Sequence, residues 1–159
     1  MNKEKIKIRK ATGKDLKQIL QLNSDLFKKE HKEYDRSLNL KWTLSKGKKY
    51  FKARISKKDG FIEVAEAKGE VVAYICGGIV ERDFYREKAK YAELDNMLVK
   101  NKLRGRGIGS RLAKDFIKWC KTKKVKYLSV TTHAKNEQGI GFYKSLGFKE
   151  YVSTLEIGF

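Results

Sequence analysis

The chain has 159 residues, a hydrophobic content of 40% and a formal net charge of +19. A chain of this length can bury a substantial core, and we expect residues 1–159 to form one domain. No apolar run approaches the roughly 20 residues that span a bilayer, and residues 1–5 carry no apolar signal segment, so we expect a cytoplasmic protein. Cys76 and Cys120 are too few for a disulfide framework or a zinc site, and no metal is expected.

The first half of the chain is predicted to alternate between strands and helices. Ile6 and Ile8 alternate with charged residues, and Thr12 can cap a helix that follows them. Gly77-Gly78 lies inside the last apolar run and indicates a bulge or a bend. In chain order, we expect a strand at 5–9, a helix after Thr12, a less regular helical region at 38–55, and antiparallel strands at 61–67 and 71–80 joined across Lys68-Gly69.

The second half of the chain is predicted to continue with strand-helix units. Hairpin strands followed by such units predict a mixed α/β sheet. Gly147 is a natural C-terminal stop for a helix. In chain order, we expect a charged loop at 81–88, the central strand at 90–99, a helix at 107–122, a strand at 126–132, a short helix at 136–146, and a last strand at 148–157 that closes the sheet.

A basic, glycine-rich loop joins the central strand to the following helix, and it reads Arg104-Gly105-Arg106-Gly107-Ile108-Gly109. The N-terminus of a helix offers unpaired backbone N–H groups and the positive end of the helix dipole. Glycines lack the Cβ atoms that would keep a ligand away from those groups. The arrangement predicts a cradle for phosphate, most naturally a diphosphate, although an ordinary basic turn would have the same composition.

Two better-known phosphate-binding loops do not fit these residues. The P-loop requires Gly-Lys followed by Ser or Thr, and that tripeptide does not occur in the chain. The Rossmann fingerprint requires a third glycine where Ser110 stands, and an acid at the end of the next strand, where residues 127–132 have none. The sequence therefore disfavours both kinds of nucleotide site.

The loop and the segments around it resemble the GNAT family of N-acetyltransferases. That family carries Arg or Gln, then Gly three residues further on, then Gly or Ala two residues after that, and Arg104, Gly107 and Gly109 occupy these positions. Asn136 follows the next strand, and residues 142–148 are similar to the C-terminal signature of the family. The resemblance implies a mixed α/β (α+β) fold, in which helices flank a central mixed, mostly antiparallel sheet.

The resemblance covers residues 92–151 closely and the start of the chain more loosely. It implies an enzyme that transfers the acetyl group of acetyl-CoA, its co-substrate, to a primary amine. The pantetheine arm would lie along the central strand, where one backbone N–H would face the thioester oxygen and stabilise negative charge. The residues expected to bind the coenzyme are Met97, Leu98, Val99, Arg104, Gly105, Arg106, Gly107, Ile108, Gly109, Ser110, Asn136 and Tyr143.

Two acids on the central strand are candidates for the base that takes the proton of the amine. Glu93 and Asp95 are two residues apart, so their side chains share one face of the strand. Acids in the middle of a sheet are costly unless they face a cleft or have partners. We expect Glu93 to act as general base, through water. Asp95 is the substitute base or a ligand of the substrate ammonium, and either acid could instead form a structural ion pair.

Tyr143 matches the tyrosine that protonates the coenzyme A thiolate in this family, and a core tyrosine is the alternative. Asn136 matches an asparagine that hydrogen-bonds the pantetheine arm or caps the helix. Cys120 is placed toward the C-terminus of a predicted helix, where the dipole disfavours a thiolate, and Cys76 lies in an apolar run. We therefore expect direct acetyl transfer rather than a route through an acetylated cysteine.

Two rival functions remain open at this point. The first is a catalytically inactive module that binds or senses acyl-CoA, which would need neither Glu93 nor Tyr143. The second is a nucleic-acid-binding protein, which the net charge suggests but no zinc-finger or RNP-type pattern supports. Residues 100–126, with eleven Lys or Arg and the single acid Asp115, instead coincide with the predicted phosphate-binding segment.

The sequence leaves the acceptor amine open. Tyr34, Asp35 and Trp42 fall in the region that shapes acceptor binding in GNAT-like folds. The positive charge of the chain would repel a free polycation, so we favour a protein N-terminus or a lysine over a free polyamine or another small amine. No membrane partner is expected, and a homodimer is left open.

Overall fold

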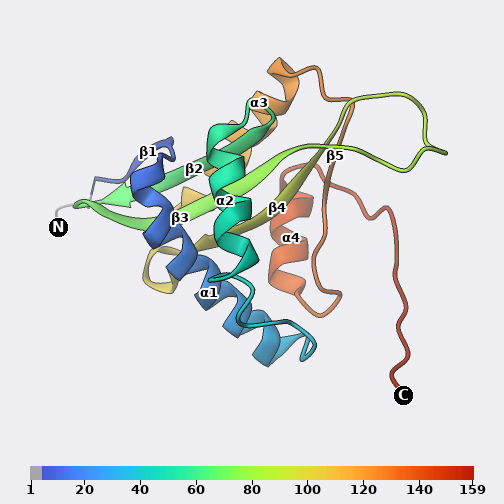
Figure 1. Ribbon diagram of the computed structural model, residues 1–159, viewed down its shortest axis with the longest axis horizontal. Helices are drawn as coiled ribbons and strands as arrows, with labels where there is room; N and C mark the ends of the chain where they lie inside the picture. Colours follow the sequence, from blue (N-terminus) through green and yellow to red (C-terminus); the bar gives the residue numbers. More distant parts are fainter. Residues whose placement is uncertain (1–4) are drawn as a thin grey trace.

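Five strands form one sheet, and strands that are neighbours in the sheet are also neighbours in the chain (Figure 1). The structure is a computed structural model that describes residues 5–159, so the expectation for residues 1–4 lies outside it. β1 to β4 pair antiparallel, whereas β5 runs parallel to β4. This confirms the predicted mixed, mostly antiparallel sheet. The strands are β1 (Lys7–Lys10), β2 (Gly60–Ala67), β3 (Glu70–Val80), β4 (Tyr91–Val99) and β5 (Tyr127–Val130).

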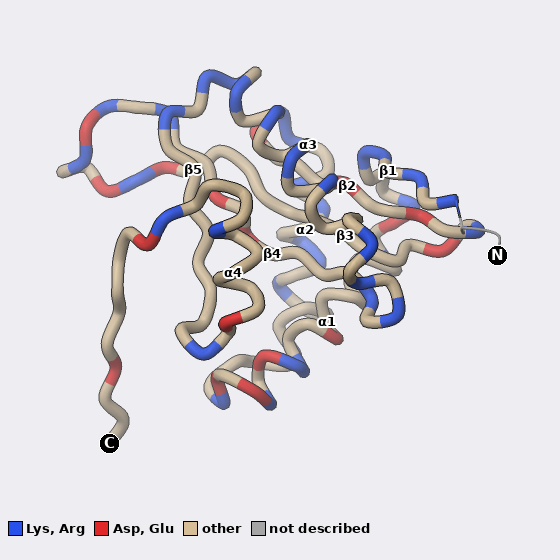
Figure 2. Tube along the Cα trace, turned by 180° about the vertical axis from the view of Figure 1, so that it is seen from behind, with Lys and Arg blue, Asp and Glu red and all other residues tan. Residues whose placement is uncertain are grey.

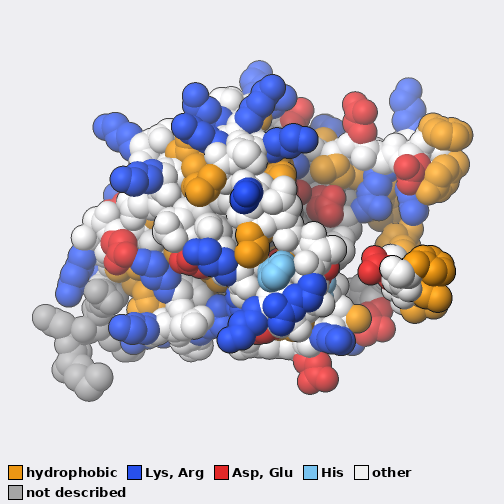
Figure 3. Space-filling view, turned by 60° about the horizontal axis from the view of Figure 1, so that its bottom comes forward, with side chains coloured by type: hydrophobic (Ala, Val, Ile, Leu, Met, Phe, Trp, Pro, Cys, Tyr) orange, Lys and Arg blue, Asp and Glu red, His pale blue; other side chains and the backbone are white. Residues whose placement is uncertain are grey.

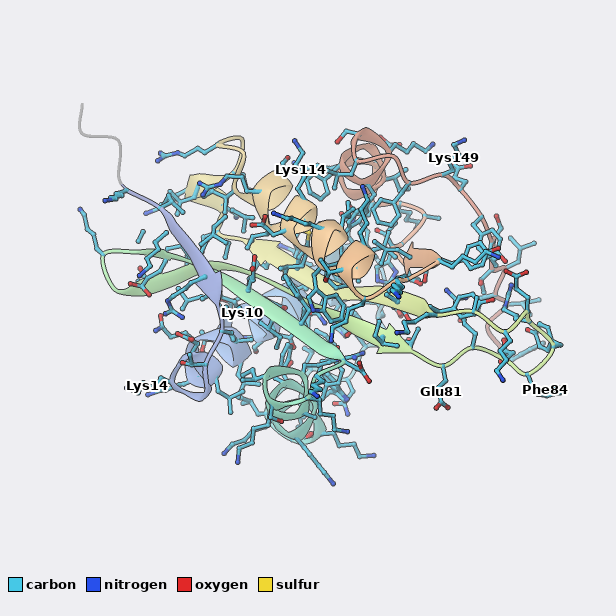
Figure 4. All side chains as sticks on the ribbon, turned by 90° about the horizontal axis from the view of Figure 1, so that it is seen from above. Lys10, Lys14, Glu81, Phe84, Lys114 and Lys149 are labelled. Atoms are coloured by element: carbon cyan, nitrogen blue, oxygen red, sulfur yellow. The ribbon has the colours of Figure 1, made fainter. Side chains whose placement is uncertain are left out.

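Helices cover both faces of the sheet, as Figure 4 shows from above. One face carries α1 (Leu16–Glu33) and α2 (Lys46–Ser56), and the other carries α3 (Ile108–Thr122) and α4 (Glu137–Ser145). Two short 3-10 turns, η1 (Gly13–Asp15) and η2 (Asn101–Leu103), precede α1 and the loop before α3. No helix within residues 5–159 has both the length and the apolar character that crossing a bilayer requires.

The core has two halves, separated by the sheet. β3 supplies side chains to both halves, and its residues 71–78 are all buried. Leu112 and Phe116 of α3 fill the half on one side, and Ile19 of α1 and Phe51 of α2 fill the other. Because these four side chains are fully buried, they fix the positions of the helices against β3, and through β3 against β4.

Most of the predicted elements are confirmed, with small shifts at their ends. The hairpin turns across Lys68-Gly69, and the predicted helix at 107–122 is α3. At the start of α1, the backbone N–H of Thr12 donates to Asp15 Oδ2 at 2.7 Å, and Arg9 pairs with the same carboxylate at 2.8 Å. The Arg9 hydrogen bond is the main reason that the pKa of Asp15 is lowered to about 2.

Two predicted elements are wrong in whole or in part. Residues 38–45 form turns rather than helix, and only the second half of the predicted 38–55 region becomes α2. The side chain of Asn39 accepts from the N–H of Lys41, and the hydroxyl of Ser45 donates to the Lys41 carbonyl. Such local hydrogen bonds compete with helix formation.

The predicted last strand at 148–157 is also wrong. Its apolar residues suit a strand, but the segment pairs with no other strand within residues 5–159 and leaves the body of the protein as an extended tail (Figure 1). Residues 149–159 are all exposed. Hydrophobic side chains accordingly stand out at one end of the molecule in Figure 3. An apolar pattern produces a strand only where a partner edge satisfies its backbone groups.

Candidate active site

A cleft of about 750 Å³ opens where β4 and β5 separate. The two strands pair from Tyr91 with Tyr127 to Leu94 with Val130, and the pairing stops there although β4 continues to Val99. The second half of β4 therefore has a free edge on this side. The cleft lies along that edge, and its other walls come from the C-terminal half of α1, the start of α3, residues 130–133 at the end of β5 and just beyond it, and α4.

A β-bulge in β4 marks the point where the two strands part. Cys76 of β3 pairs with Asn96 and Gly77 pairs with Leu94, so Asp95 is the extra residue. The side chains of Asp95 and Asn96 consequently both turn toward the α1–α2 face, where Asn96 Oδ1 accepts from the buried Tyr74 hydroxyl at 2.7 Å. A bulge increases local twist and ends regular pairing, which explains why β4 leaves β5 here.

The glycine loop forms one end of the cleft. Gly105 and Gly107 have φ values of 72° and 75°, a left-handed conformation that glycine adopts without strain. Gly107 is the N-cap of α3, and its carbonyl accepts the first helical hydrogen bond from the N–H of Arg111 at 3.0 Å. The N–H groups of Ile108 to Ser110 precede that bond and are available to a ligand. A Cβ on Gly107 would meet open space, so the cradle is unfilled by protein atoms.

The residues expected to bind the coenzyme fall almost entirely along this cleft. Met97 to Val99 line it from β4, and the loop residues from Arg104 to Ser110 line its end, except Arg106, which is exposed and does not line the cleft. Arg104 is held at the end of β4, because its Nε donates to the carbonyl of Val99 at 3.0 Å. The predicted phosphate end and the predicted pantetheine wall are thus joined by a direct hydrogen bond.

Tyr143 and Asn136 reach the cleft from α4 and its N-cap. Tyr143 packs against Phe142 and Phe148, and burial raises the pKa of its phenol to about 12. The phenol is therefore protonated at neutral pH and can donate a proton. Asn136 Oδ1 accepts from the N–H of Gly139 at 3.0 Å, so this side chain caps α4 while it lines the cleft.

Asp95 lines the cleft and is held by α2. Arg54 Nη2 lies 3.0 Å from Asp95 Oδ2, and the hydroxyl of Tyr50 donates to the same oxygen. Burial raises the pKa of Asp95, while the hydrogen bond from Tyr50 and the charge of Arg54 oppose that rise. The ion-pair alternative for one of the two acids is thus realised at Asp95.

Glu93 lies on the same face of β4 as Asp95, two residues before this extra residue of the bulge. Glu93 does not line the cleft itself. Among residues 5–159 it makes no hydrogen bond or ion pair, although the charges of Arg82 and Arg54 act on it. Burial, and then the negative charge of Asp95, raise the pKa of Glu93. A half-buried carboxylate without a hydrogen-bond partner is a competent proton acceptor if water connects it to the cleft.

Phe27 and Glu30 of α1 line the cleft although neither was expected there from the sequence, whereas Trp42 falls in the region expected to shape acceptor binding. Phe27 and Trp42 stack at 5.4 Å with nearly parallel rings and form an aromatic wall. Glu30 of α1 faces His133 across the cleft, and burial raises the pKa of Glu30. Phe27 had the spacing of a core residue, and no signal in the sequence separates such a residue from one that lines a cavity.

A second cavity, of about 990 Å³, is lined by the η2 segment and by residues of α1, β3 and β4. It contains neither Asp95 nor Tyr143, and the residues it shares with the cleft are Lys29, Leu98, Val99, Leu103, Arg104 and Gln138. No group of three or more metal-binding side chains occurs in the part of the chain that the structure describes.

Comparison with known proteins agrees with this geometry. The acetyltransferase (GNAT) family profile matches residues 16–148. An uncharacterized N-acetyltransferase of Methanocaldococcus jannaschii is 31% identical over 147 residues, which make up 90% of this chain and 60% of that relative. The chain therefore spans about 60% of the length of this relative.

Solved structures share the fold. A mutant of the BH1408 protein from Bacillus halodurans superposes with a TM-score of 0.79 at 21% identity, over 96% of this chain and 99% of the other. The aminoglycoside N-acetyltransferase AAC(6')-Iy in complex with CoA superposes with a TM-score of 0.75 at 16% identity, over 98% of this chain and 95% of the other. At these identities the similarity establishes the fold.

Proposed function

The chain belongs to the acetyltransferase (GNAT) family, and from this premise we propose that it transfers the acetyl group of acetyl-CoA directly to a primary amine. The observation that supports this activity most is that one cleft joins three features. These are an open helix N-terminus at Gly107, the free edge of β4, and the protonated phenol of Tyr143.

The coenzyme end of the cleft has the chemistry that a diphosphate requires. The first backbone N–H groups of α3 have no partner within the helix, a Cβ on Gly107 would meet no atom, and the helix dipole favours negative charge there. Arg104 adds a cation at the same end. The residues that we propose for coenzyme binding are those expected from the sequence, Met97, Leu98, Val99, Arg104, Gly105, Gly107, Ile108, Gly109, Ser110, Asn136 and Tyr143, whereas exposed Arg106 can contribute only through its charge.

The transfer step needs a base, a donor for the carbonyl oxygen and an acid. The amine nitrogen bonds to the carbonyl carbon as the carbon–sulfur bond breaks. A backbone N–H from the free edge of β4 stabilises the carbonyl oxygen. The nitrogen loses its proton through water to Glu93, or to Asp95 as the substitute, and Tyr143 gives its proton to the departing sulfur.

The two cysteines are poor candidates for an acetyl-cysteine intermediate, which favours direct transfer. Burial raises the pKa of Cys76 to about 12 and that of Cys120 to about 11, so neither forms a thiolate readily. Neither cysteine lines the cleft. An acetyl-cysteine route therefore has no candidate nucleophile among the residues that the structure describes.

Coenzyme binding and turnover test this proposal together. Acetyl-CoA should raise the melting temperature of the protein, and Gly107→Glu should abolish that shift by placing bulk and negative charge in the cradle. Gly69→Glu is the matched control, because Gly69 also has a positive φ and open space but lies in the β2–β3 turn. Release of free CoA thiol is then measured against a panel of peptides and small amines.

The outcomes distinguish the proposed activity from its two rivals and test the assignment of the glycine loop. Binding without release of CoA thiol for any amine would indicate the inactive acyl-CoA-binding module. Unchanged coenzyme affinity in Gly107→Glu would overturn the assignment of the loop. Salt-dependent retention on DNA without any coenzyme binding would indicate a nucleic-acid-binding protein instead.

A further inference from the structure

A strongly basic surface, which we call the α2 surface, reaches the cleft at Trp42. It is formed by residues 36–58, a segment that contains no Asp or Glu. In Figure 2 the tube of α2 accordingly carries Lys and Arg colour and no Asp or Glu colour. The cations of the segment are Arg36, Lys41, Lys46, Lys48, Lys49, Lys52, Arg54, Lys57 and Lys58.

The positive charge of the α2 surface is not neutralised within the protein. Arg54 is turned inward and pairs with Asp95. The other eight cations are exposed, and no ion pair joins any of them to an acid within residues 5–159. Folding brings like charges together here at an electrostatic cost, and an anionic partner would relieve that repulsion.

A row of aromatic side chains leads from this surface into the cleft. Trp42, from the same segment, stacks on Phe27, and both line the cleft. The ring centroid of Trp42 lies 5.7 Å from that of Tyr50, whose hydroxyl donates to Asp95. Aromatic faces and a carboxylate favour an ammonium group and an aliphatic stem between them.

The cleft contains acids, which the α2 surface lacks. Asp95 and Glu30 line the cleft together with the cations Lys29 and Arg104, whereas the α2 surface, which reaches the cleft at Trp42, carries exposed lysines and no acid. An acceptor that satisfies both has one ammonium group on a body that is otherwise negative. A polyamine or an aminoglycoside carries several positive charges and would be repelled at the α2 surface.

We propose that the α2 surface docks an acidic protein segment, whose lysine or N-terminal amine enters the cleft between Trp42 and Asp95. This inference rests on the proposed acetyltransferase function and specifies its substrate class. Nucleic acid would also bind exposed lysines, but it brings no aliphatic amine to the cleft. The amine-binding features beside the α2 surface therefore favour an acidic polypeptide.

The first experiment compares acceptors at saturating acetyl-CoA. Two peptides carry one lysine each, flanked by Glu and Asp in one and by Arg in the other, and spermine represents free polycations. We expect kcat/KM to be roughly tenfold higher for the acidic peptide at low salt, and the preference to shrink as salt is added. Equal values, or a preference for spermine at both salt concentrations, would overturn the inference while leaving acetyltransferase activity in place.

The second experiment reverses charge on the α2 surface. The triple variant Lys46→Glu, Lys48→Glu and Lys49→Glu should raise KM for the acidic peptide roughly tenfold, with KM for acetyl-CoA unchanged. Its control makes the same change in charge with Lys7→Glu, Lys14→Glu and Lys17→Glu, which lie on β1, η1 and the first turn of α1 and line neither cavity. Figure 4 labels Lys14 at the β1 end of the molecule.

The results distinguish this inference from the proposed function. If no amine releases CoA thiol and no coenzyme binds, the proposed function itself fails. If turnover persists but both triple variants behave alike, the α2 surface does not dock the acceptor. If a short RNA binds through Lys46, Lys48 and Lys49 and the acidic peptide has no advantage, the surface binds nucleic acid and the inference is wrong.

Discussion

Arg54 on α2 pairs with Asp95, the extra residue in the bulge of β4, across a distance of 3.0 Å. The pair connects the helix that carries the basic α2 surface to the strand that forms the wall of the cleft. Both side chains are largely buried, with 19% and 15% of their surfaces exposed. The position of the bulge and the position of α2 are therefore coupled.

Arg54→Ala should destabilise the protein by about 1–3 kcal/mol, because it leaves a largely buried carboxylate without its cation. It should also raise the pKa of Asp95 further, since Arg54 now opposes the effect of burial. Urea denaturation at neutral pH measures the loss. Arg54→Lys, which keeps the charge, should recover part of it, and a variant as stable as the wild type would show that the pair contributes nothing.

The identity of the base can be read from the pH dependence of kcat. A base works when it is deprotonated, so the rate rises with pH through its pKa, and a raised pKa moves that rise to higher pH. Glu93→Gln should flatten the rising limb and lower kcat roughly a hundredfold. Asp95→Asn is the companion variant. If Asp95→Asn flattens the rising limb while Glu93→Gln does not, Asp95 is the base.

Tyr143→Phe should lower kcat by roughly a hundredfold while KM for acetyl-CoA changes little, because the lost proton acts on the departing sulfur. The removed hydroxyl makes no hydrogen bond within residues 5–159, so the fold should tolerate the change. Tyr127→Phe, at an exposed position on β5, serves as control. Equal kcat in wild type and Tyr143→Phe would show that solvent supplies the proton.

The sequence located the glycine-loop end of the cleft better than its aromatic wall. The Arg104 to Gly109 loop is recognisable because a diphosphate cradle needs glycine at fixed positions. The aromatic wall depends on side chains that tertiary packing brings together, such as Phe27 and Trp42. The spacing of Phe27 predicted a core residue, and Trp42 was placed only by its position in the region expected to shape acceptor binding. The path of the turns at 38–45 brings Trp42 to the cleft.

The two glycines in β3 show where local prediction reached its limit. Gly77-Gly78 indicated an irregularity, and the register does shift beside Gly77, but the extra residue belongs to β4. A Cβ on Gly78 would lie 2.2 Å from Arg54 Nη1, so this glycine makes room for the guanidinium that holds Asp95. A contact between residues so distant in the chain cannot be read from either segment alone.

Gly47→Ala should disturb the aromatic wall without touching the coenzyme end. A Cβ on Gly47 would lie 2.9 Å from the ring of Trp42 and 3.0 Å from its carbonyl oxygen, so the indole must move. We expect KM for the amine to rise roughly tenfold while acetyl-CoA affinity is kept, as overpacking shifts side chains. Gly13→Ala, where a Cβ meets nothing, is the control. An unchanged amine KM would exclude Trp42 from acceptor binding.

Glu63→Gln should stabilise the protein at neutral and higher pH. Glu63 lies on β2 and faces α3, Oε2 is buried without a hydrogen-bond partner within residues 5–159, and burial, followed by the charge of Asp115, raises its pKa to about 7. The unfolded chain releases this proton near pH 4.5, whereas the folded chain keeps it until about pH 7. The free energy of unfolding therefore falls as pH rises through this interval.

Glutamine keeps the shape of the side chain and removes its titration. The melting temperature of Glu63→Gln should accordingly exceed that of the wild type by roughly 2–4 °C at about pH 8, and the difference should vanish at about pH 4, where both states of the wild type hold the proton. Glu81→Gln, at an exposed loop position, is the control for the substitution itself. A constant difference between Glu63→Gln and wild type at both pH values would mean that packing, rather than the buried charge, is responsible.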